Sequence, residues 1–74
     1  MNVDMLKCLV ELSGGKPDGV DSDKFFEHFP NNAATLADLQ FLRQEKYIYF
    51  VGPIDNLYGF DVTIKALKYF NWSL

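Results

Sequence analysis

Few residues in this chain could do covalent chemistry, and the most reactive of them is its single cysteine, Cys8. A thiolate nucleophile needs a base, and His28, the one histidine, is the candidate partner. Such a pair also needs an orienting third group and an oxyanion site, and no catalytic motif in the sequence supplies them. Cys8 lies instead in an apolar segment, which raises the pKa of a thiol and favours inert packing. The sequence therefore predicts that this protein is not an enzyme.

Acidic residues form a second candidate site at positions 18–23, with the order Asp-Gly-Val-Asp-Ser-Asp, followed by Glu27. Carboxylates in a loop can bind calcium, but a calcium-binding loop places its glycine after the third acid, and here the glycine follows the first. Loop solvation and helix capping explain these acids instead. His28 has no second histidine or cysteine near it in the sequence, so we expect it at the surface or the edge of the core. The sequence predicts no metal and no other cofactor.

The composition indicates one globular domain over residues 1–74. Hydrophobic residues make up 49% of the chain and aromatic residues 16%, which is enough for a compact core without a metal or disulfide. No apolar run is long enough for a signal peptide or a membrane span, so we expect a cytoplasmic protein without membrane contact. The net charge of −3 and the pI of about 4.8 disfavour nucleic acid as a partner. This acidity lies in residues 1–30, because residues 31–74 carry four cations and four acids.

The first element predicted is a helix from Val3 to about Ser13. Asn2 is placed to cap its start, and Gly14-Gly15 suit its end because glycine adopts positive φ freely. The polar residues of this helix are spaced three and four apart and form one stripe: Asp4, Lys7 and Glu11. A helix that is apolar elsewhere is either central to the core or covered on a second side by a partner.

A loop and a second helix follow. Residues 14–21 have a loop composition, in which Val20 is placed for a short strand contact. Ser22 then begins a short helix that runs through Phe29 and is ended by Pro30. Asn31 or Asn32 caps the next helix after a turn of two or three residues. Two helices joined this closely are a helix-turn-helix candidate.

Residues 31–62 are the unit around which the chain is organised, as a helix, a strand, a turn and a returning strand. The helix carries three leucines predicted to face inward, Leu36, Leu39 and Leu42. The strands are predicted at 47–51 and 58–62, joined by a turn at 52–57. Their aromatic residues, Tyr47, Tyr49, Phe50, Tyr58 and Phe60, could stack on nucleic acid bases, but alternation in a half-buried hairpin explains them better. Thr63 then caps a last helix with three residues on its inward side, Ile64, Leu67 and Phe70.

Parts of this pattern resemble a known family. Leu39, Leu42, Lys46 and Tyr47-Ile48 resemble the end of the recognition helix and the first wing strand of winged helix-turn-helix proteins. Residues 62–70 resemble the helix that follows the wing, through Val62-Thr63, Lys65-Ala66 and Tyr69-Phe70. The resemblance covers nearly the whole chain, and it is closest to small uncharacterised winged-helix proteins of Gram-positive bacteria and their phages. It implies an α+β fold with three or four helices and a small antiparallel hairpin, the wing.

The chain departs from this family at two positions. Lys46 stands where glycine usually precedes the aromatic-isoleucine pair, and a lysine at positive φ is less favourable than glycine. Ala66 stands where the last helix usually has glycine, which is a mild change because alanine suits a helix better.

The resemblance implies a DNA-binding transcriptional regulator of bacterial or phage origin, with the helix after Asn32 in the major groove of double-stranded DNA. With Leu39 at the centre of the buried face, the predicted outward residues are Ala33, Ala34, Ala37, Gln40, Phe41 and Gln44. Glutamine can read adenine, and an alanine can meet a thymine methyl group. The candidate DNA-binding residues are therefore Asn32, Ala33, Ala37, Gln40, Phe41, Arg43, Gln44 and Asn56.

Charge argues against this function. Arg43 is predicted nearer the buried side of the helix, and the predicted wing tip at 54–57 carries Asp55 where a phosphate contact favours a base. The alternative is a protein-protein interaction module on the same scaffold, without DNA binding.

The two ends of the chain supply a candidate patch for self-association or for a protein partner. The first helix has more apolar circumference than a small core can cover, and the last helix adds aromatic residues outside its inward stripe. The candidate patch residues are Met5, Cys8, Val10, Tyr69 and Trp72. A homodimer and a monomer, in which the other elements wrap the first helix, are both consistent with the sequence.

Overall fold

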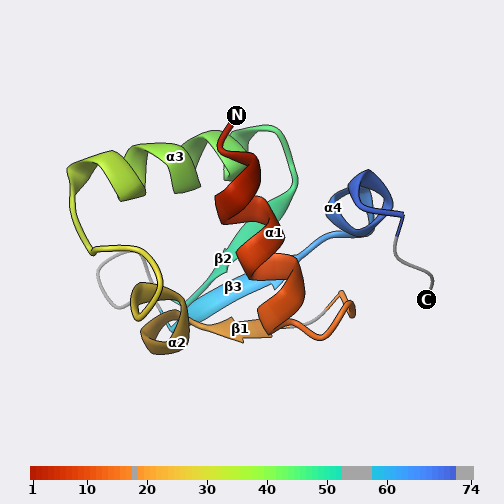
Figure 1. The fold of residues 1–74 in the computed structure, drawn as a ribbon, viewed down its shortest axis with the longest axis horizontal. Coiled ribbons are helices and arrows are strands. Elements are labelled where there is room, and N and C mark those ends of the chain that lie inside the picture. Colours follow the sequence, from red (N-terminus) through yellow and green to blue (C-terminus); the bar gives the residue numbers. More distant parts are fainter. Residues whose placement is uncertain (18, 53–57, 72–74) are drawn as a thin grey trace.

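The fold is an α+β arrangement of helices around a small antiparallel sheet (Figure 1). The computed structural model describes residues 1–17, 19–52 and 58–71. Its elements are α1 (Val3–Leu12), β1 (Gly19–Asp21), α2 (Ser22–Phe26), α3 (Ala33–Gln44), β2 (Ile48–Val51), β3 (Gly59–Val62) and α4 (Ile64–Tyr69). The strands pair in the order β1-β3-β2. The predicted helix, strand and returning strand are confirmed, and the predicted contact at Val20 is a third strand. Of the predicted turn, residues 53–57 lie outside the described residues.

The helix termini follow local sequence signals. Three predicted caps accept a hydrogen bond from the backbone amide three residues later: Asn2 from Met5, Asn32 from Thr35 and Thr63 from Ala66. Gly14 and Gly15 follow α1 with φ of 70° and 76°, as predicted for its end. Within the described ranges, every helix is too short or too polar to span a lipid bilayer.

The second helix differs from the prediction. α2 begins at Ser22, as predicted, but ends at Phe26 instead of Phe29. The side chain of Asp21 caps its start by accepting from the Asp23 amide at 2.8 Å. The chain tightens after Phe26 because the amide of His28 bonds to the carbonyl of Phe25, three residues back. Residues 27–32 therefore separate α2 from α3, which is a longer connection than the predicted turn.

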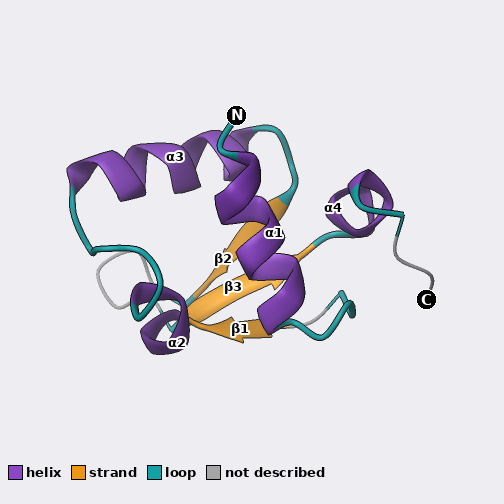
Figure 2. Ribbon diagram, in the orientation of Figure 1, coloured by secondary structure: helices purple, strands orange, loops and turns teal. Residues whose placement is uncertain are grey.

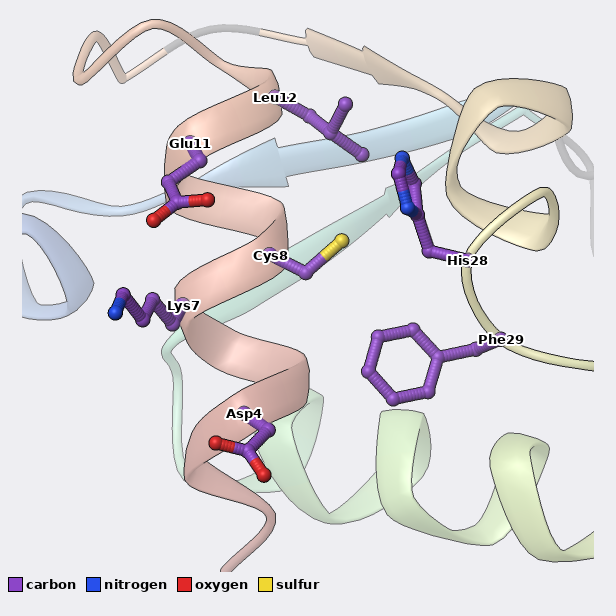
Figure 3. A pocket seen from close by; sticks show the side chains of 7 residues that line it. All are labelled: Asp4, Lys7, Cys8, Glu11, Leu12, His28 and Phe29. Carbon is purple, nitrogen blue, oxygen red and sulfur yellow. The ribbon is translucent and has the colours of Figure 1, made fainter.

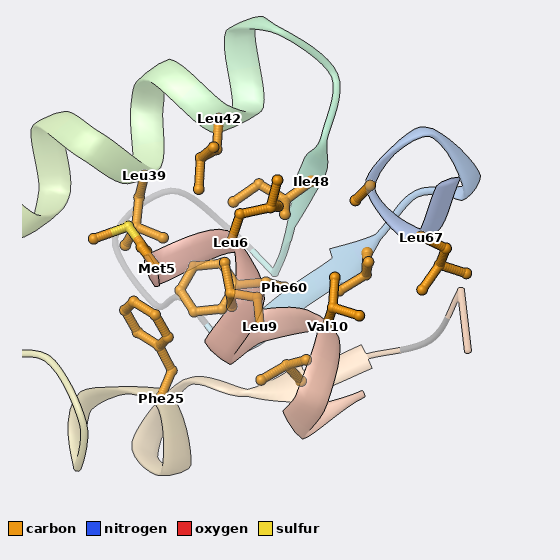
Figure 4. Packing of buried hydrophobic residues seen from close by; sticks show 13 residues of the cluster. Met5, Leu6, Leu9, Val10, Phe25, Leu39, Leu42, Ile48, Phe60 and Leu67 are labelled. Atoms are coloured by element: carbon orange, nitrogen blue, oxygen red, sulfur yellow. The ribbon is translucent and has the colours of Figure 1, made fainter. Parts of the chain in front are cut away.

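The core is built around α1, which crosses one face of the sheet (Figure 2). Its buried residues are Met5, Leu6, Leu9 and Val10. They join buried side chains from every other element of the described fold: Val20, Phe25, Leu39, Leu42, Ile48, Phe60, Val62, Ala66 and Leu67 (Figure 4). The sequence left two alternatives for the first helix, a central place in the core or burial by a partner, and the structure shows it at the centre of the core.

Two predicted inward residues are instead exposed. Leu36 is 43% exposed, and Thr35 takes its place beside Leu39 and Leu42 on the buried side of α3. Spacings of four and three residues keep these three side chains on one face of a helix, whereas Leu36 is rotated away from it. Ile64 is 50% exposed, because α4 turns Ala66 and Leu67 into the core.

Residues at the start of α4 form hydrogen bonds to the turn that follows α3. Lys46 adopts a φ of 64°, the left-handed conformation in which a lysine is less favourable than a glycine. The Thr63 hydroxyl donates toward the carbonyl oxygens of Lys46 and Tyr47, at 2.8 and 3.0 Å. The Lys65 ammonium donates to the carbonyl of Glu45 at 2.7 Å and lies 4.4 Å from the centre of the Tyr47 ring. These contacts from a distant segment compensate for the local strain.

The core assignment predicts unequal effects of one substitution at two leucines of α3. Leu39 is fully buried, so Leu39→Ala should lower the free energy of unfolding by about 2 to 5 kcal/mol in a urea titration. Leu36→Ala is the matched control and should lower it by less than about 1 kcal/mol. Equal losses for the two variants would contradict the facing of α3.

Gly59 is predicted to be essential where β3 meets β1. A Cβ atom at Gly59 would overlap the carbonyl oxygen of Val20, whereas one at Gly19 would lie at an ordinary 3.5 Å from Asp61 Oδ1. Gly59→Ala should therefore reduce stability by about 1 to 3 kcal/mol or more, because backbone must move. Gly19→Ala should leave thermal unfolding nearly unchanged. If both variants melt at the wild-type temperature, the close approach of β1 and β3 is wrong.

Candidate nucleic-acid interface

The outward face of α3 is open to solvent as predicted. Ala33, Ala34, Ala37, Gln40, Phe41 and Gln44 are all exposed. Asn32 is exposed as well, although its side-chain oxygen is occupied by the cap of α3. Asn56, the candidate from the wing, lies outside the described residues, as does the rest of the predicted tip at 54–57.

The side chain of Arg43, which is predicted nearer the buried side of α3, reaches the residues of the outward face. It is exposed, and together with Gln40 and Gln44 it lines a hollow of about 390 Å³. Its Nη1 donates to Gln40 Oε1 at 3.4 Å, a long and weak hydrogen bond, and its Cζ lies 4.9 Å from the centre of the Phe50 ring. The guanidinium is thus held over β2 beside two glutamine amides. Sequence reasoning missed this role of Phe50.

The helix that carries this hollow has few cations. Arg43 is the one cation within α3. Lys65 is occupied at the carbonyl of Glu45, and the carboxylate of Asp38 accepts from Asn2 Nδ2 at 3.0 Å. Two large apolar side chains of α3 are exposed instead, Leu36 and Phe41, each at 43%. The face therefore combines a small polar centre with apolar side chains.

The hairpin shows the predicted alternation of aromatic residues. Phe60 is fully buried, Phe50 is half-buried, and Tyr49 is 53% exposed on the opposite face of the sheet. Phe60 packs edge to face against Phe25 and Phe50, with ring centres 5.3 and 5.7 Å apart. The inward rings are thus engaged in the core, while Tyr49 and Tyr58 face solvent.

Two of the five residues assigned to the candidate self-association patch are wrong. Met5 and Val10 are buried in the core, so neither can contact a partner in the folded chain. Cys8 is half-buried and Tyr69 is exposed, with its ring edge to face with those of Tyr47 and Phe70. Trp72 lies outside the described residues. A substitution such as Val10→Asp would disrupt the core and could not report on dimerisation.

Cys8 and His28, separated in the sequence, meet at one pocket between α1 and the segment after α2 (Figure 3). The pocket has a volume of about 500 Å³, and its other lining residues are Asp4, Lys7, Glu11, Leu12 and Phe29. Burial raises the pKa of the Cys8 thiol above its ordinary value of 9.0, and the charge of Glu11 raises it further. The described residues contain no group of three or more histidine, cysteine or acidic side chains arranged to hold a metal ion. Because its pKa is raised, the Cys8 thiol is protonated near neutral pH and is a poor nucleophile.

The thiol pKa predicts how Cys8 reacts. Because the folded pKa is raised, carbamidomethylation by iodoacetamide near neutral pH should be slower in the folded protein than in urea, and should accelerate as the pH rises beyond 9.0. By linkage, the thiol should also favour the folded state below its unfolded pKa and lose that contribution as pH rises through the folded value. Glu11→Gln should speed labelling of the folded chain. A folded thiol that is faster than the unfolded one would refute this.

Comparison of the chain with models of known protein families, with curated proteins and with solved structures finds no match in any of the three.

Proposed function

We propose that this chain is a small winged helix-turn-helix protein that binds double-stranded DNA, as a transcriptional regulator of bacterial or phage origin does. The proposal is supported by the order of elements, in which a helix and a short strand precede two helices and a hairpin. It is also supported by β3 lying between β1 and β2, so that the hairpin extends from a three-stranded sheet beside α3. In this arrangement α3 is the recognition helix and the β2–β3 hairpin is the wing.

The convergence of Gln40, Arg43 and Gln44 on one exposed hollow carries the proposal. Glutamine pairs with the N6 and N7 edge of adenine, and arginine with the O6 and N7 edge of guanine, through two hydrogen bonds each. Phe50 lies under the Arg43 guanidinium and limits its freedom before binding, which lowers the entropy lost on contact. These three residues are of the two types suited to reading base edges in the major groove.

Affinity should come from base contacts more than from phosphate contacts. Each phosphate neutralised by a protein cation makes the slope of log K against log salt more negative by about 0.9. With one cation within α3 and a net charge of −3, we expect a shallow slope of about −1. A steep slope would place the basic contacts elsewhere on the molecule.

Alanine variants of the hollow test this function. On duplexes enriched from a randomised library at low salt, Gln40→Ala and Arg43→Ala should each weaken binding by about 5- to 150-fold in fluorescence anisotropy, the value of one good base contact. Lys68→Ala removes the same charge from the exposed surface of α4 and should bind like the wild type. If all duplexes fail to bind even at low salt, or if Lys68→Ala weakens binding as much as Arg43→Ala, the proposed function is wrong.

A protein-interaction module on the same scaffold is the second candidate, favoured by the exposure of Leu36 and Phe41. Aromatic anchors at the centre of a contact surface contribute much of the energy of protein binding, and Phe41 is of that kind. If α3 binds a protein, Phe41→Ala should abolish capture of that protein while Gln40→Ala leaves it intact. For DNA the expected order is the reverse, so the same two variants separate the two functions.

A further inference from the structure

The outer face of the sheet, turned away from α1, has a regular pattern set by the strand register. Across the three strands, Tyr49 pairs with Asp61 and Asp61 with Gly19. The next row on the same face joins Val51, Gly59 and Asp21. Two glycines therefore alternate with two carboxylates and two larger side chains on this face.

A hollow of about 250 Å³ lies on this face, which we call the outer sheet hollow. It is lined by Gly19, Asp21, Val51, Tyr58, Gly59 and Asp61, together with backbone of Val20. The two glycines keep its floor low, and Gly59 must be glycine because a Cβ atom there would overlap Val20. Tyr58, at 65% exposure, is available as one wall. The hollow is thus a consequence of the packing of β1 on β3.

The charges of the outer sheet hollow are all of one sign. None of the described residues that line it is a lysine or an arginine. Asp21 is exposed, and its Oδ1 accepts from the Asp23 amide, whereas Asp61 is half-buried on β3, the central strand of the sheet. Diagonal neighbours on adjacent antiparallel strands lie roughly 7 to 8 Å apart, which places these two carboxylates on either side of the glycine floor.

Size and chemistry select the occupant. Pockets for drug-sized molecules have volumes of roughly 300 to 1,000 Å³, so this hollow suits a single side chain. Paired carboxylates next to an exposed aromatic ring favour a planar cation, because a guanidinium donates to carboxylates in pairs and stacks on a ring. We infer that the outer sheet hollow is the docking site for an arginine side chain presented by a protein partner. Nucleic acid is excluded here, since two carboxylates repel phosphate.

This surface is separate from the candidate DNA-binding face. None of the residues lining the outer sheet hollow belongs to α3, and Gln40, Arg43 and Gln44 line a different hollow. The inference therefore does not rest on the proposed function. A chain that uses both surfaces would bind a basic protein at the outer sheet hollow and leave α3 free for DNA.

The probe for this site is the blocked tripeptide acetyl-Gly-Arg-Gly-amide, titrated into the isotope-labelled protein while backbone amide shifts are recorded. The expected shifts centre on Gly19, Tyr49, Gly59 and Asp61, with an affinity in the millimolar range. The same tripeptide with glutamine in place of arginine should produce none. The lysine tripeptide should bind more weakly, because an ammonium cannot form a bidentate hydrogen bond with a carboxylate or stack on an aromatic ring as a guanidinium does.

Three variants decide the outcome. Asp61→Asn and Tyr58→Ala should each weaken binding of the arginine tripeptide by about fivefold or more. The first variant loses a charge-assisted hydrogen bond and the second loses the aromatic ring on which the guanidinium stacks. Glu11→Gln removes the same charge from α1, on the other side of the sheet, and should change nothing. Tyr58 is exposed, so its variant keeps the test valid even if Asp61→Asn is unstable. The inference would be overturned if the arginine tripeptide caused no shifts, or if the lysine tripeptide caused equal shifts. It would also be overturned if Glu11→Gln reduced the shifts as much as Asp61→Asn does.

Discussion

The burial of α1 on most of its circumference is the constraint on which the rest of the structure depends. Leu6 and Leu9 are fully buried, and α1 contacts α2, β3 and α4 while its cap residue Asn2 bonds to Asp38 of α3. A chain of 74 residues has a small core, so each of its other elements must turn its apolar side toward this one helix. Among the residues that the structure describes, the helices consequently cover one face of the sheet, and α3 buries one of its sides.

Two surfaces remain open as a result, and both candidate sites lie on them. α3 is bonded to other elements at its middle and just after its end: Asn2 donates to Asp38, and Lys65 and Thr63 donate to carbonyls of the turn that follows. Gln40, Arg43 and Gln44 are therefore presented on a rigid element, which favours recognition because little order must be gained on binding. The opposite face of the sheet carries two carboxylates instead. The acidity that disfavours DNA binding for the whole chain is thus partly located away from α3.

The sequence predicts the features that depend on near neighbours. The caps at Asn2, Asn32 and Thr63, the glycines after α1 and the strands of the hairpin each follow from residues within a few positions. The rotation of α3 could not be predicted in the same way: leucines at 36, 39 and 42 suggest one inward face, but the tertiary packing buries Thr35 in place of Leu36. Met5 and Val10 were misassigned for a related reason. An apolar helix surface does not indicate whether the residues that bury it belong to the same chain or to a partner. The contact of Arg43 with Phe50 and the outer sheet hollow depend on strand register, which no local pattern reveals.

The central claim is that the exposed face of α3 binds duplex DNA, and mapping the backbone amide shifts tests it most directly. Isotope-labelled protein would be titrated at low salt with a duplex of mixed sequence and, separately, with a single strand of the same length. The proposed function predicts that the duplex shifts residues 33–44 and the strand residues beside Arg43, and leaves Gly19 and Asp61 on the outer face of the sheet unmoved. An absence of shifts with the duplex, or shifts confined to α1 and α4, would contradict it.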